Sequence, residues 1–479
     1  MVVYYGANDG SLRAVSGSTG KELWAFVAPE SFPYLTRLMT SSPLVNYPNL
    51  PAGIIPTPTS KDYFFDGSTG AYQNSDNSKV WIYPSMRRGG RTIYAFDVTT
   101  PTSPSFKWKI GCPNLANDTG CSSGMTGIGQ TWSTPEVAFV KGYSTSTPVV
   151  IVGGGYDSCE DQNTATPTCT TPKGATVYVL NANDGTVLAT FNTTRSVAAD
   201  ISLIDIDLDG AVDYAYVADT GGNVYRINFI NGSTGLALDK TLWTMNRVGY
   251  TNGAGRKFLF PPALLLNSGQ VYVALGSGDR EHPLSSQYPY SGVVNRFYVF
   301  KDGLAAIPTA INLDDTTQMI DNTTTTTCSS EQVTPSSTKK GWFMTLNQNG
   351  QGEQTVTSAV ITAGMVTFST NRPIPPAAGT CSNALGEARG YFLNLLNGSG
   401  SIGIADSCGG TRSAIFAGGG LPPSPVLGTI PVGGVPKTVL IGAIQRSGAS
   451  SSPIQGQQVR PPISSIRKRV YWYMPGSDN

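Results

Sequence analysis

The sequence contains one nine-residue stretch, residues 205–213, with aspartates at its first, third, fifth and ninth places and a glycine at its sixth. Calcium prefers six to eight hard oxygen ligands at about 2.3–2.6 Å, and a tightly coiled loop directs alternate side chains to one point. Gly210 permits the sharp turn because it lacks a Cβ. The spacing therefore predicts a calcium loop with these ligands: the carboxylates of Asp205, Asp207, Asp209 and Asp213, and the backbone carbonyl of Ala211.

The same stretch could be an ordinary Asp-rich β-turn without an ion, because Asp and Gly are common turn residues. Residues 200–225 contain no lysine or arginine that could neutralise four converging carboxylates. Such a cluster is costly without a cation, so this absence favours the calcium loop. The apolar side chains of Ile206, Leu208 and Val212 are then expected to point away from the ion into packing.

The segments that position this loop are expected to be strands. A helical calcium hand needs a glutamate at the twelfth place, where this chain has Tyr216. The flanking residues 201–204 and 214–217 are rich in β-branched, aromatic and other apolar residues and read as extended. The loop is therefore placed between two strands.

The composition indicates a protein built of strands and turns. Charged residues make up only 13% of the 479 residues, while Gly (55) and Pro (33) are abundant. The net charge of +1 gives no electrostatic reason to expect nucleic acid or an anionic membrane as a partner. No run of about 18 apolar residues is present, so we expect no integral membrane segment.

The cysteines suggest an oxidising compartment. Seven are present and none forms a CxxC pattern: Cys112, Cys121, Cys159, Cys169, Cys328, Cys381 and Cys408. The first two and the next two each bracket a short polar loop, which indicates disulfides and a periplasmic or extracellular location. The pairing among the last three stays open, with one thiol left over. Seven reduced thiols in a cytosolic protein are the alternative.

A short unit of strand, tight turn and strand recurs along the chain. Its first copy, residues 2–24, contains an Asn-Asp-Gly turn and ends near Trp24. Six further copies occupy residues 91–108, 175–185, 214–243, 271–300, 390–393 and 439–473, and the last three of these are looser. Seven short-strand units at irregular spacing predict an all-β fold, a β-propeller with seven modified blades.

Long polar insertions separate these units, and we expect them to be surface loops at blade connections. They are residues 42–78, 112–129, 159–172, 311–340 and 448–465. Residues 1–479 are expected to form a single propeller, with the first blade closed by strands from both termini, including residues 469–473. Because the chain opens directly in strand-like sequence, we expect it to be the excised C-terminal domain of a longer protein.

Several segments in this order resemble a known family. They are residues 6–10, 89–98, 205–226, 276–283 and 341–344. They are similar to the C-terminal domain of PilC/PilY-type type IV pilus biogenesis and tip adhesin proteins, and the resemblance covers nearly the whole chain. It implies a modified seven-bladed propeller with one calcium (Ca2+) site, carried by the same five residues of the loop 205–213.

The resemblance also implies a function. The domain would lie outside the cell, at the pilus tip or outer-membrane surface of a Gram-negative bacterium, as part of the fimbrium. Calcium occupancy would regulate pilus extension versus retraction, twitching motility and surface attachment. The partners would be minor pilins and the pilus machinery, together with a host or abiotic surface for cell adhesion.

Two other classes of protein share features with this chain. Residues 7–24 look like the tryptophan-docking repeat of quinoprotein dehydrogenases, but those enzymes take calcium ligands from separate blades. Here the ligands are local to one loop, the docking pattern is strong only once, and no adjacent Cys-Cys pair exists. Integrin-like propellers carry a calcium loop in several blades, whereas this chain has one.

The chain is not expected to be an enzyme. His282 is the sole histidine, and general acid-base catalysis would need a positioned partner and a pocket that no motif here provides. We expect His282 to brace a turn beside Asp279 and Arg280.

Overall fold

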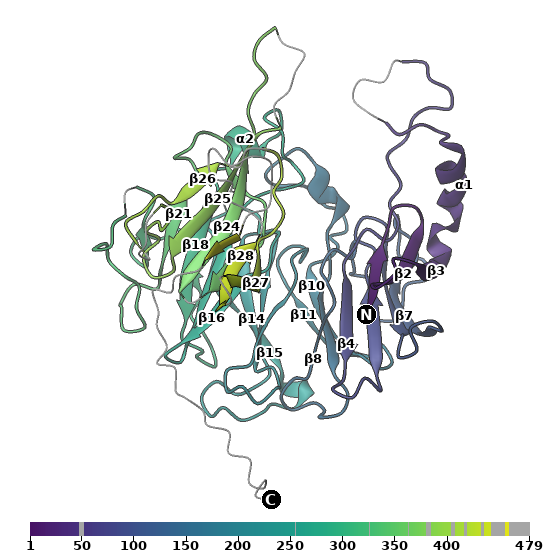
Figure 1. The fold of residues 1–479 in the computed structure, drawn as a ribbon, viewed down its shortest axis with the longest axis horizontal. Helices are drawn as coiled ribbons and strands as arrows, with labels where there is room; N and C mark the ends of the chain where they lie inside the picture. Colours follow the sequence, from purple (N-terminus) through teal and green to yellow (C-terminus); the bar gives the residue numbers. More distant parts are fainter. Residues whose placement is uncertain are drawn as a thin grey trace, which may run out of the picture.

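The computed structural model describes the chain in the following ranges: 1–46, 52–253, 255–324, 326–362, 364–379, 385–403, 408–415, 419–432, 435–441 and 456–458. These residues form seven sheets, numbered here 1 to 7 in chain order. In Figure 1 the strands run from purple at the right, through blue and teal in the middle, to green and yellow at the left.

Sheets 1 to 3 are antiparallel. Sheet 1 contains β1 (Val2–Gly6), β2 (Ser11–Ser16) and β3 (Glu22–Val27). Sheet 2 contains β4 (Thr69–Gln73), β5 (Val80–Pro84), β6 (Arg91–Asp97) and β7 (Ser105–Cys112). Sheet 3 contains β8 (Glu136–Ala138), β9 (Val149–Gly153), β10 (Thr176–Asn181) and β11 (Val187–Asn192).

Sheets 4 and 5 each add one short parallel strand at the outer part of the sheet. Sheet 4 contains β12 (Ser202–Ile204), β13 (Tyr214–Ala218), β14 (Asn223–Asn228), β15 (Thr244–Tyr250) and the parallel β19 (Ile311–Asn312). Sheet 5 contains β16 (Ala263–Asn267), β17 (Gln270–Gly276), β18 (Arg296–Asp302), β21 (Gly341–Thr345) and the parallel β20 (Met319–Asp321).

Sheets 6 and 7 and a few short helices complete the described chain. Sheet 6 contains β22 (Gln354–Thr355), β23 (Val360–Thr362), β24 (Met365–Arg372), β25 (Glu387–Asn394) and β26 (Ser413–Ile415). Sheet 7 contains β27 (Val426–Val432), β28 (Val435–Ile441) and β29 (Gly456–Gln458). The helices are η1 (Pro29–Ser31), α1 (Phe32–Thr40), η2 (Ser158–Asp161), η3 (Lys240–Leu242) and α2 (Pro289–Gly292).

Early strands of neighbouring sheets lie side by side. Strand β1 contacts β4, β4 contacts β8 and β12 contacts β16, and β16 contacts β23, the second strand of sheet 6 in chain order. Sheets that meet through their early strands and carry the later strands outward have the arrangement of a β-propeller. The predicted all-β propeller is confirmed, and the seven sheets of the described residues are compatible with seven blades.

The hydrophobic core lies between consecutive sheets, as β10 illustrates. Its side chains alternate between the two faces of sheet 3, because successive residues of a strand point to opposite sides. Tyr178 and Leu180 pack with Trp108 of sheet 2, whereas Val177 and Val179 pack with residues of sheet 4. Burial on both faces explains why this strand is almost entirely apolar rather than alternating.

Tryptophans link neighbouring sheets in a second way. An indole N–H in one sheet donates a hydrogen bond to a backbone carbonyl in a turn of the next sheet. The described residues include three such bonds: Trp24 to Pro101 at 2.9 Å, Trp108 to Ala182 at 3.2 Å, and Trp342 to Leu395 at 2.8 Å. The docking pattern, clear in the sequence only around residues 7–24, therefore has structural counterparts in later blades.

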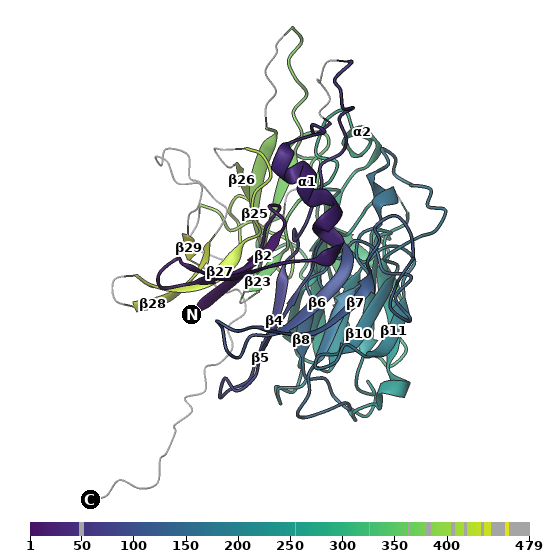
Figure 2. The ribbon, with the colours of Figure 1, turned by 90° about the vertical axis from the view of Figure 1, so that its right-hand side faces the viewer.

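The insertions differ in part from the predicted surface loops. Strand β4 lies inside the stretch 42–78, and β19 and β20 lie inside 311–340, because each finds a partner strand in a sheet. Helix α1 was not predicted, and it lies at the outer edge of the molecule beside β2 and β3 (Figures 1 and 2). The predicted closing strand at residues 469–473 falls outside the described residues.

The disulfides follow the prediction where it was definite. Cys112 is bonded to Cys121 and Cys159 to Cys169. The structure also selects a pair that the sequence left open, because Cys328 is bonded to a cysteine 80 residues later, Cys408. The remaining cysteine, Cys381, lies outside the described residues. None of the helices in the described part of the chain is long and apolar enough to span a bilayer.

Candidate metal centre

The Asp-rich loop connects β12 to β13 in sheet 4, between strands as predicted. These two strands pair antiparallel, with Ile204 opposite Tyr214, so the two ends of the loop lie next to each other. Strand β13 is fully buried, and the loop therefore projects from a rigid part of the sheet.

The loop is wound around the side chain of Asp205. The two carboxylate oxygens of Asp205 accept hydrogen bonds from the backbone N–H groups of Leu208 and Gly210, both at 2.7 Å. Asp209 accepts one from the N–H of Ala211 at 3.0 Å. Leu208 and Gly210 have φ values of 62° and 92°, the left-handed region in which glycine is unstrained. The predicted role of Gly210 in the turn is thus seen directly.

Three of the predicted ligands converge. Asp205, Asp207 and Asp209 each offer a carboxylate oxygen, and these oxygens lie within 4.8 Å of one another. Two oxygens bound to one calcium ion lie at most about 5 Å apart, so the donor set and its spacing fit this ion. In the part of the chain that the structure describes, this is the single such group made of three carboxylates, which does not favour an integrin-like array of calcium loops.

The fourth aspartate is placed differently. Asp213 is buried, with 1% of its side chain exposed, and one of its oxygens accepts a hydrogen bond from the backbone N–H of Ile206 at 2.7 Å. Burial raises the pKa of Asp213 above its ordinary value. Asp213 therefore holds the start of the loop against its end. Its second oxygen lies 3.6 Å from the Nζ of Lys141, which also contacts Asp207 and Asp209.

Lys141 was missed by the sequence reasoning. Its Nζ lies 2.8 Å from an oxygen of Asp207, 2.7 Å from one of Asp209 and 3.6 Å from one of Asp213. Hydrogen bonds to Asp207 and Asp209 raise the pKa of Lys141, and the bond from Lys141 lowers the pKa of Asp207. The argument that no cation neutralises the cluster therefore holds only for the local sequence.

No sequence signal pointed to this lysine, because it lies 66 residues from Asp207. It follows Val140, which forms a parallel bridge with Val212 at the end of the loop. The backbone N–H of Lys141 donates to the carbonyl of Val212 at 3.1 Å, and that of Val212 donates to Phe139 at 2.8 Å. Sheet 3 thus delivers a cation to a loop of sheet 4.

The prediction for the apolar residues of the loop is partly wrong. Ile206 packs against the core between sheets 4 and 5, and Val212 packs between sheets 3 and 4, as expected. Leu208, however, is 86% exposed. Its left-handed backbone turns the side chain away from the sheet, so it forms a projecting apolar tip beside the carboxylates.

His282 lies in a buried cluster of hydrogen bonds and ion pairs. Its Nδ1 lies 2.9 Å from a carboxylate oxygen of Asp279, as the sequence suggested, and its Nε2 lies 3.3 Å from the carbonyl of Asp161. Lys257, which is 1% exposed, bridges Asp279 and Glu160 at 2.8 and 2.9 Å. This buried ionic cluster joins loops of sheets 3 and 5, and apart from the pairing of His282 with Asp279 it was not predicted.

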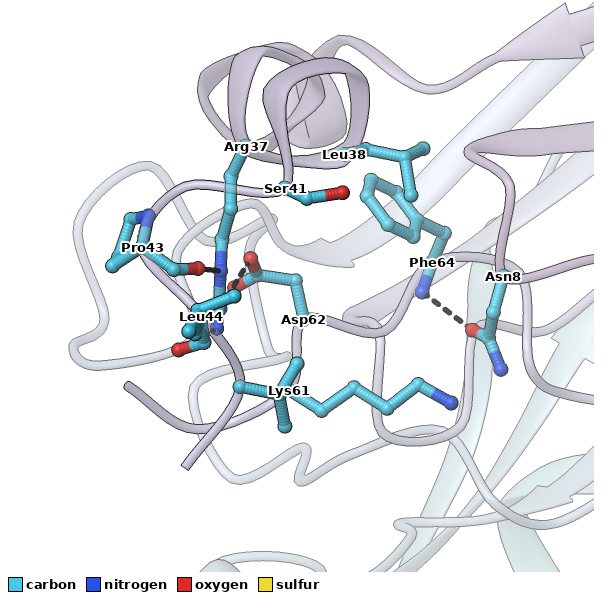
Figure 3. A pocket seen from close by; sticks show the side chains of 10 residues that line it. Asn8, Arg37, Leu38, Ser41, Pro43, Leu44, Lys61, Asp62 and Phe64 are labelled. Atoms are coloured by element: carbon cyan, nitrogen blue, oxygen red, sulfur yellow. Dashed lines mark hydrogen bonds and ion pairs between the residues drawn. The ribbon is translucent and has the colours of Figure 1, made fainter. Parts of the chain in front are cut away.

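A separate pocket of about 430 Å³ lies beside α1. Figure 3 shows Leu38 and Phe64 along one side and Arg37 reaching toward Pro43 and Asp62 on the other. Arg37 donates to the carbonyl of Pro43 and to Asp62, both at 2.8 Å, so its charge is already used in holding the pocket wall together. None of the predicted calcium ligands lines this pocket.

The fold and the loop together define a β-propeller with an Asp-rich loop suited to a divalent cation. Residues 57–239 match the family model described as the PilY1 beta-propeller domain. The predicted resemblance to PilC/PilY-type C-terminal domains is confirmed by this match. The matched segment includes the whole loop 205–213 and Lys141.

Known proteins agree with this assignment. A type IV pilus biogenesis factor PilY1 homolog of Xylella fastidiosa is 25% identical over 491 residues, which cover 98% of this chain and 35% of the relative. The type IV pilus biogenesis factor PilY1 of Pseudomonas aeruginosa is 27% identical over 238 residues, which cover 48% of this chain and 17% of the relative. This chain thus spans about a third of the length of the first relative. Neither relative is named as an enzyme.

A solved structure shares the fold. The crystal structure of the Pseudomonas aeruginosa PilY1 C-terminal domain superimposes with a TM-score of 0.62 at 17% sequence identity. The match covers 92% of this chain and 90% of that domain.

Proposed function

We propose that this chain is the calcium-binding propeller domain of a type IV pilus biogenesis factor and tip adhesin. The observation that carries the proposal is the convergence of Asp205, Asp207 and Asp209 in one loop of a PilY1-family propeller. These three carboxylates would hold Ca2+, and the Ala211 carbonyl and Asp213 would complete the site. The ion supplies charge neutralisation and rigidity there, and it supports no catalytic step.

Calcium occupancy regulates pilus extension versus retraction, twitching motility and surface attachment. The loop carries the exposed Leu208 at its tip, so a change in loop conformation alters an apolar feature that a partner can contact. Binding to one of two forms stabilises that form by about 2.7 kcal/mol when free calcium exceeds Kd about a hundredfold. A shift of that size changes the ratio of two surface states about a hundredfold.

The domain acts outside the cell, at the pilus tip or outer-membrane surface. Three disulfides support an oxidising location, because such bonds rarely persist in a reducing cytosol. The names of the relatives support the pilus machinery and minor pilins as partners. A host or abiotic surface is the target of attachment.

The test is calorimetric titration of the chelator-treated domain with calcium and, separately, with magnesium. Asp209→Ala removes one ligand, and Asp184→Ala is the matched control. Both aspartates are directly followed by a glycine. The side chain of each accepts a hydrogen bond from the backbone N–H two residues later, at 3.0 Å from Ala211 for Asp209 and at 2.9 Å from Thr186 for Asp184. Asp184 therefore reproduces the turn role of Asp209 without belonging to the carboxylate group.

We expect one calcium per domain, much weaker magnesium binding, loss of binding in Asp209→Ala and unchanged binding in Asp184→Ala. A folded wild-type domain that binds no calcium would overturn the metal site. In the bacterium that carries this chain, Asp209→Ala should alter piliation and twitching while Asp184→Ala should not. Calcium binding lost in Asp209→Ala without any change in piliation or twitching would refute the regulatory role.

A further inference from the structure

We propose that Lys141 is a tethered cation that competes with calcium for the loop 205–213. The ammonium group holds the carboxylates together when calcium is absent and must leave when the ion enters. This inference rests on the proposed calcium function and adds a regulatory residue to it. It makes the site an exchange between two cations, one of them part of the chain.

The position of the ammonium group supports the exchange. Nζ lies within 2.8 Å of oxygens from both Asp207 and Asp209, which are two of the three converging ligands. It is also 3.6 Å from Asp213. A cation in contact with oxygens of several predicted ligands occupies space that a calcium ion bound to the same oxygens would need.

The two cations are mutually exclusive on electrostatic grounds. A divalent ion and an ammonium group a few ångströms apart repel each other strongly, particularly where the side chain of Lys141 is only 16% exposed. Each oxygen that binds the ion also loses its hydrogen bond to Nζ. Calcium therefore binds only after Lys141 has moved away.

The lysine can move without disturbing the fold. Its backbone stays paired with Val212, at 3.1 Å from N–H to carbonyl, while its four-carbon side chain has several rotatable bonds through which the ammonium group can change position. The ammonium group remains charged and reaches water. When calcium binds, the ammonium group of Lys141 leaves the carboxylates, so the arrangement of charges changes where sheets 3 and 4 meet.

The exchange has a measurable consequence for affinity. Calcium must replace existing ion pairs in the wild-type loop, whereas in a loop without the lysine it meets carboxylates that repel one another. Removing the lysine charge should therefore tighten calcium binding. The same change should weaken the calcium-free protein, because the carboxylates lose their counterion.

The experiment compares wild type with Lys141→Met, which keeps an unbranched side chain and removes the charge. Lys21→Met is the matched control, because Lys21 is an exposed lysine directly before β3 and its loss changes the net charge equally. Each protein is titrated with calcium by calorimetry after chelator treatment. Thermal unfolding is then measured in chelator and in saturating calcium.

We expect Lys141→Met to bind calcium at least about tenfold more tightly than wild type. Its melting temperature should be below that of wild type in chelator and should rise more on calcium addition. Lys21→Met should match wild type in both measurements. Equal or weaker calcium binding by a folded Lys141→Met protein would overturn the competition while leaving the calcium site intact. Absence of calcium binding in both proteins would instead remove the proposed function, and the competition with it.

Discussion

The indole nitrogen of Trp108 donates a hydrogen bond to the backbone carbonyl of Ala182, 3.2 Å away, and joins the last strand of sheet 2 to the turn between β10 and β11 of sheet 3. The hydroxyl of Tyr83 donates to the same carbonyl at 2.8 Å. Gly185 also belongs to this contact, because a Cβ at this residue would lie only 2.8 Å from the Trp108 ring. The interface between blades thus depends on a glycine in one blade and an aromatic ring in the other.

Gly185→Ala should destabilise the domain through this contact. A Cβ at residue 185 would lie 2.8 Å from a ring carbon of Trp108, and the φ of 77° is unfavourable for alanine. Gly235→Ala is the control, because Gly235 has a similar φ of 69° in a similar turn but meets nothing within 4 Å. We expect a loss of about 1 kcal/mol for the control from backbone strain and about 1–3 kcal/mol more for Gly185→Ala from overpacking.

Denaturant unfolding of both variants measures the difference. Both glycines donate their N–H to the carbonyl four residues earlier, at 2.9 Å for Gly185 and 2.7 Å for Gly235, so the turn itself is matched. Equal losses in the two variants would show that Trp108 yields to the added methyl group and that the contact does not set the spacing of the blades.

Lys257→Met should be strongly destabilising. Lys257 is 1% exposed and lies between Glu160 and Asp279, so its removal leaves two buried carboxylates without their shared counterion. A loss of about 3–5 kcal/mol in the free energy of unfolding is expected. Lys301→Met is the comparison, because the buried Lys301 donates only to neutral backbone carbonyls, those of Thr334, Pro335 and Ser337.

Chemical unfolding of the two lysine variants provides the measurement. The loss for Lys257→Met should exceed that for Lys301→Met, because Asp279 then keeps only His282 as a cationic partner and Glu160 keeps only Arg195. If the two single variants lose the same free energy, the charge of Lys257 has no special role in joining sheets 3 and 5.

Stability should fall as the pH rises from about 4.5 to about 7 because of Glu136. Burial, with a smaller contribution from the nearby Asp200, raises the pKa of Glu136 to about 7 from its usual 4.5. The folded state therefore holds this proton more tightly than the unfolded state. The resulting loss of stability is absent below about pH 4.5, grows up to about pH 7, and amounts to about 3 kcal/mol above it.

Glu136→Gln isolates this contribution because glutamine resembles the protonated acid. The variant should be more stable than wild type at about pH 8 and similar to it at about pH 4.5, with Glu331→Gln, an exposed position, as the control. The pKa of His282 is also raised, chiefly through its bond to Asp279 against the opposing effect of burial, and it changes stability in the same direction. Because wild type and Glu136→Gln both contain His282, its contribution cancels when the stabilities of the two proteins are compared. A difference between Glu136→Gln and wild type that does not change with pH would contradict the raised pKa.

Features that depend on neighbouring residues could be predicted from the sequence. The spacing of aspartates around Gly210 predicted a turn between strands, and the structure has that turn, because residues so close in the chain have little freedom to be elsewhere. The two short disulfides followed from spacings of 9 and 10 residues for the same reason. The recurring strand units likewise indicated a propeller, since each unit is a local hairpin.

The remaining features were decided by packing between distant segments. Lys141 reaches a loop 66 residues away, and Cys328 pairs with a partner 80 residues away, only because neighbouring sheets are brought together around the fold. The exposed Leu208 was also unforeseen, since its direction depends on the backbone angle that the hydrogen bonds of Asp205 impose. The sequence by itself determined the candidate ligands, which lie within one turn of chain. The tertiary structure decided which cation stands beside them, because contacts between blades depend on how the sheets pack and leave no local pattern.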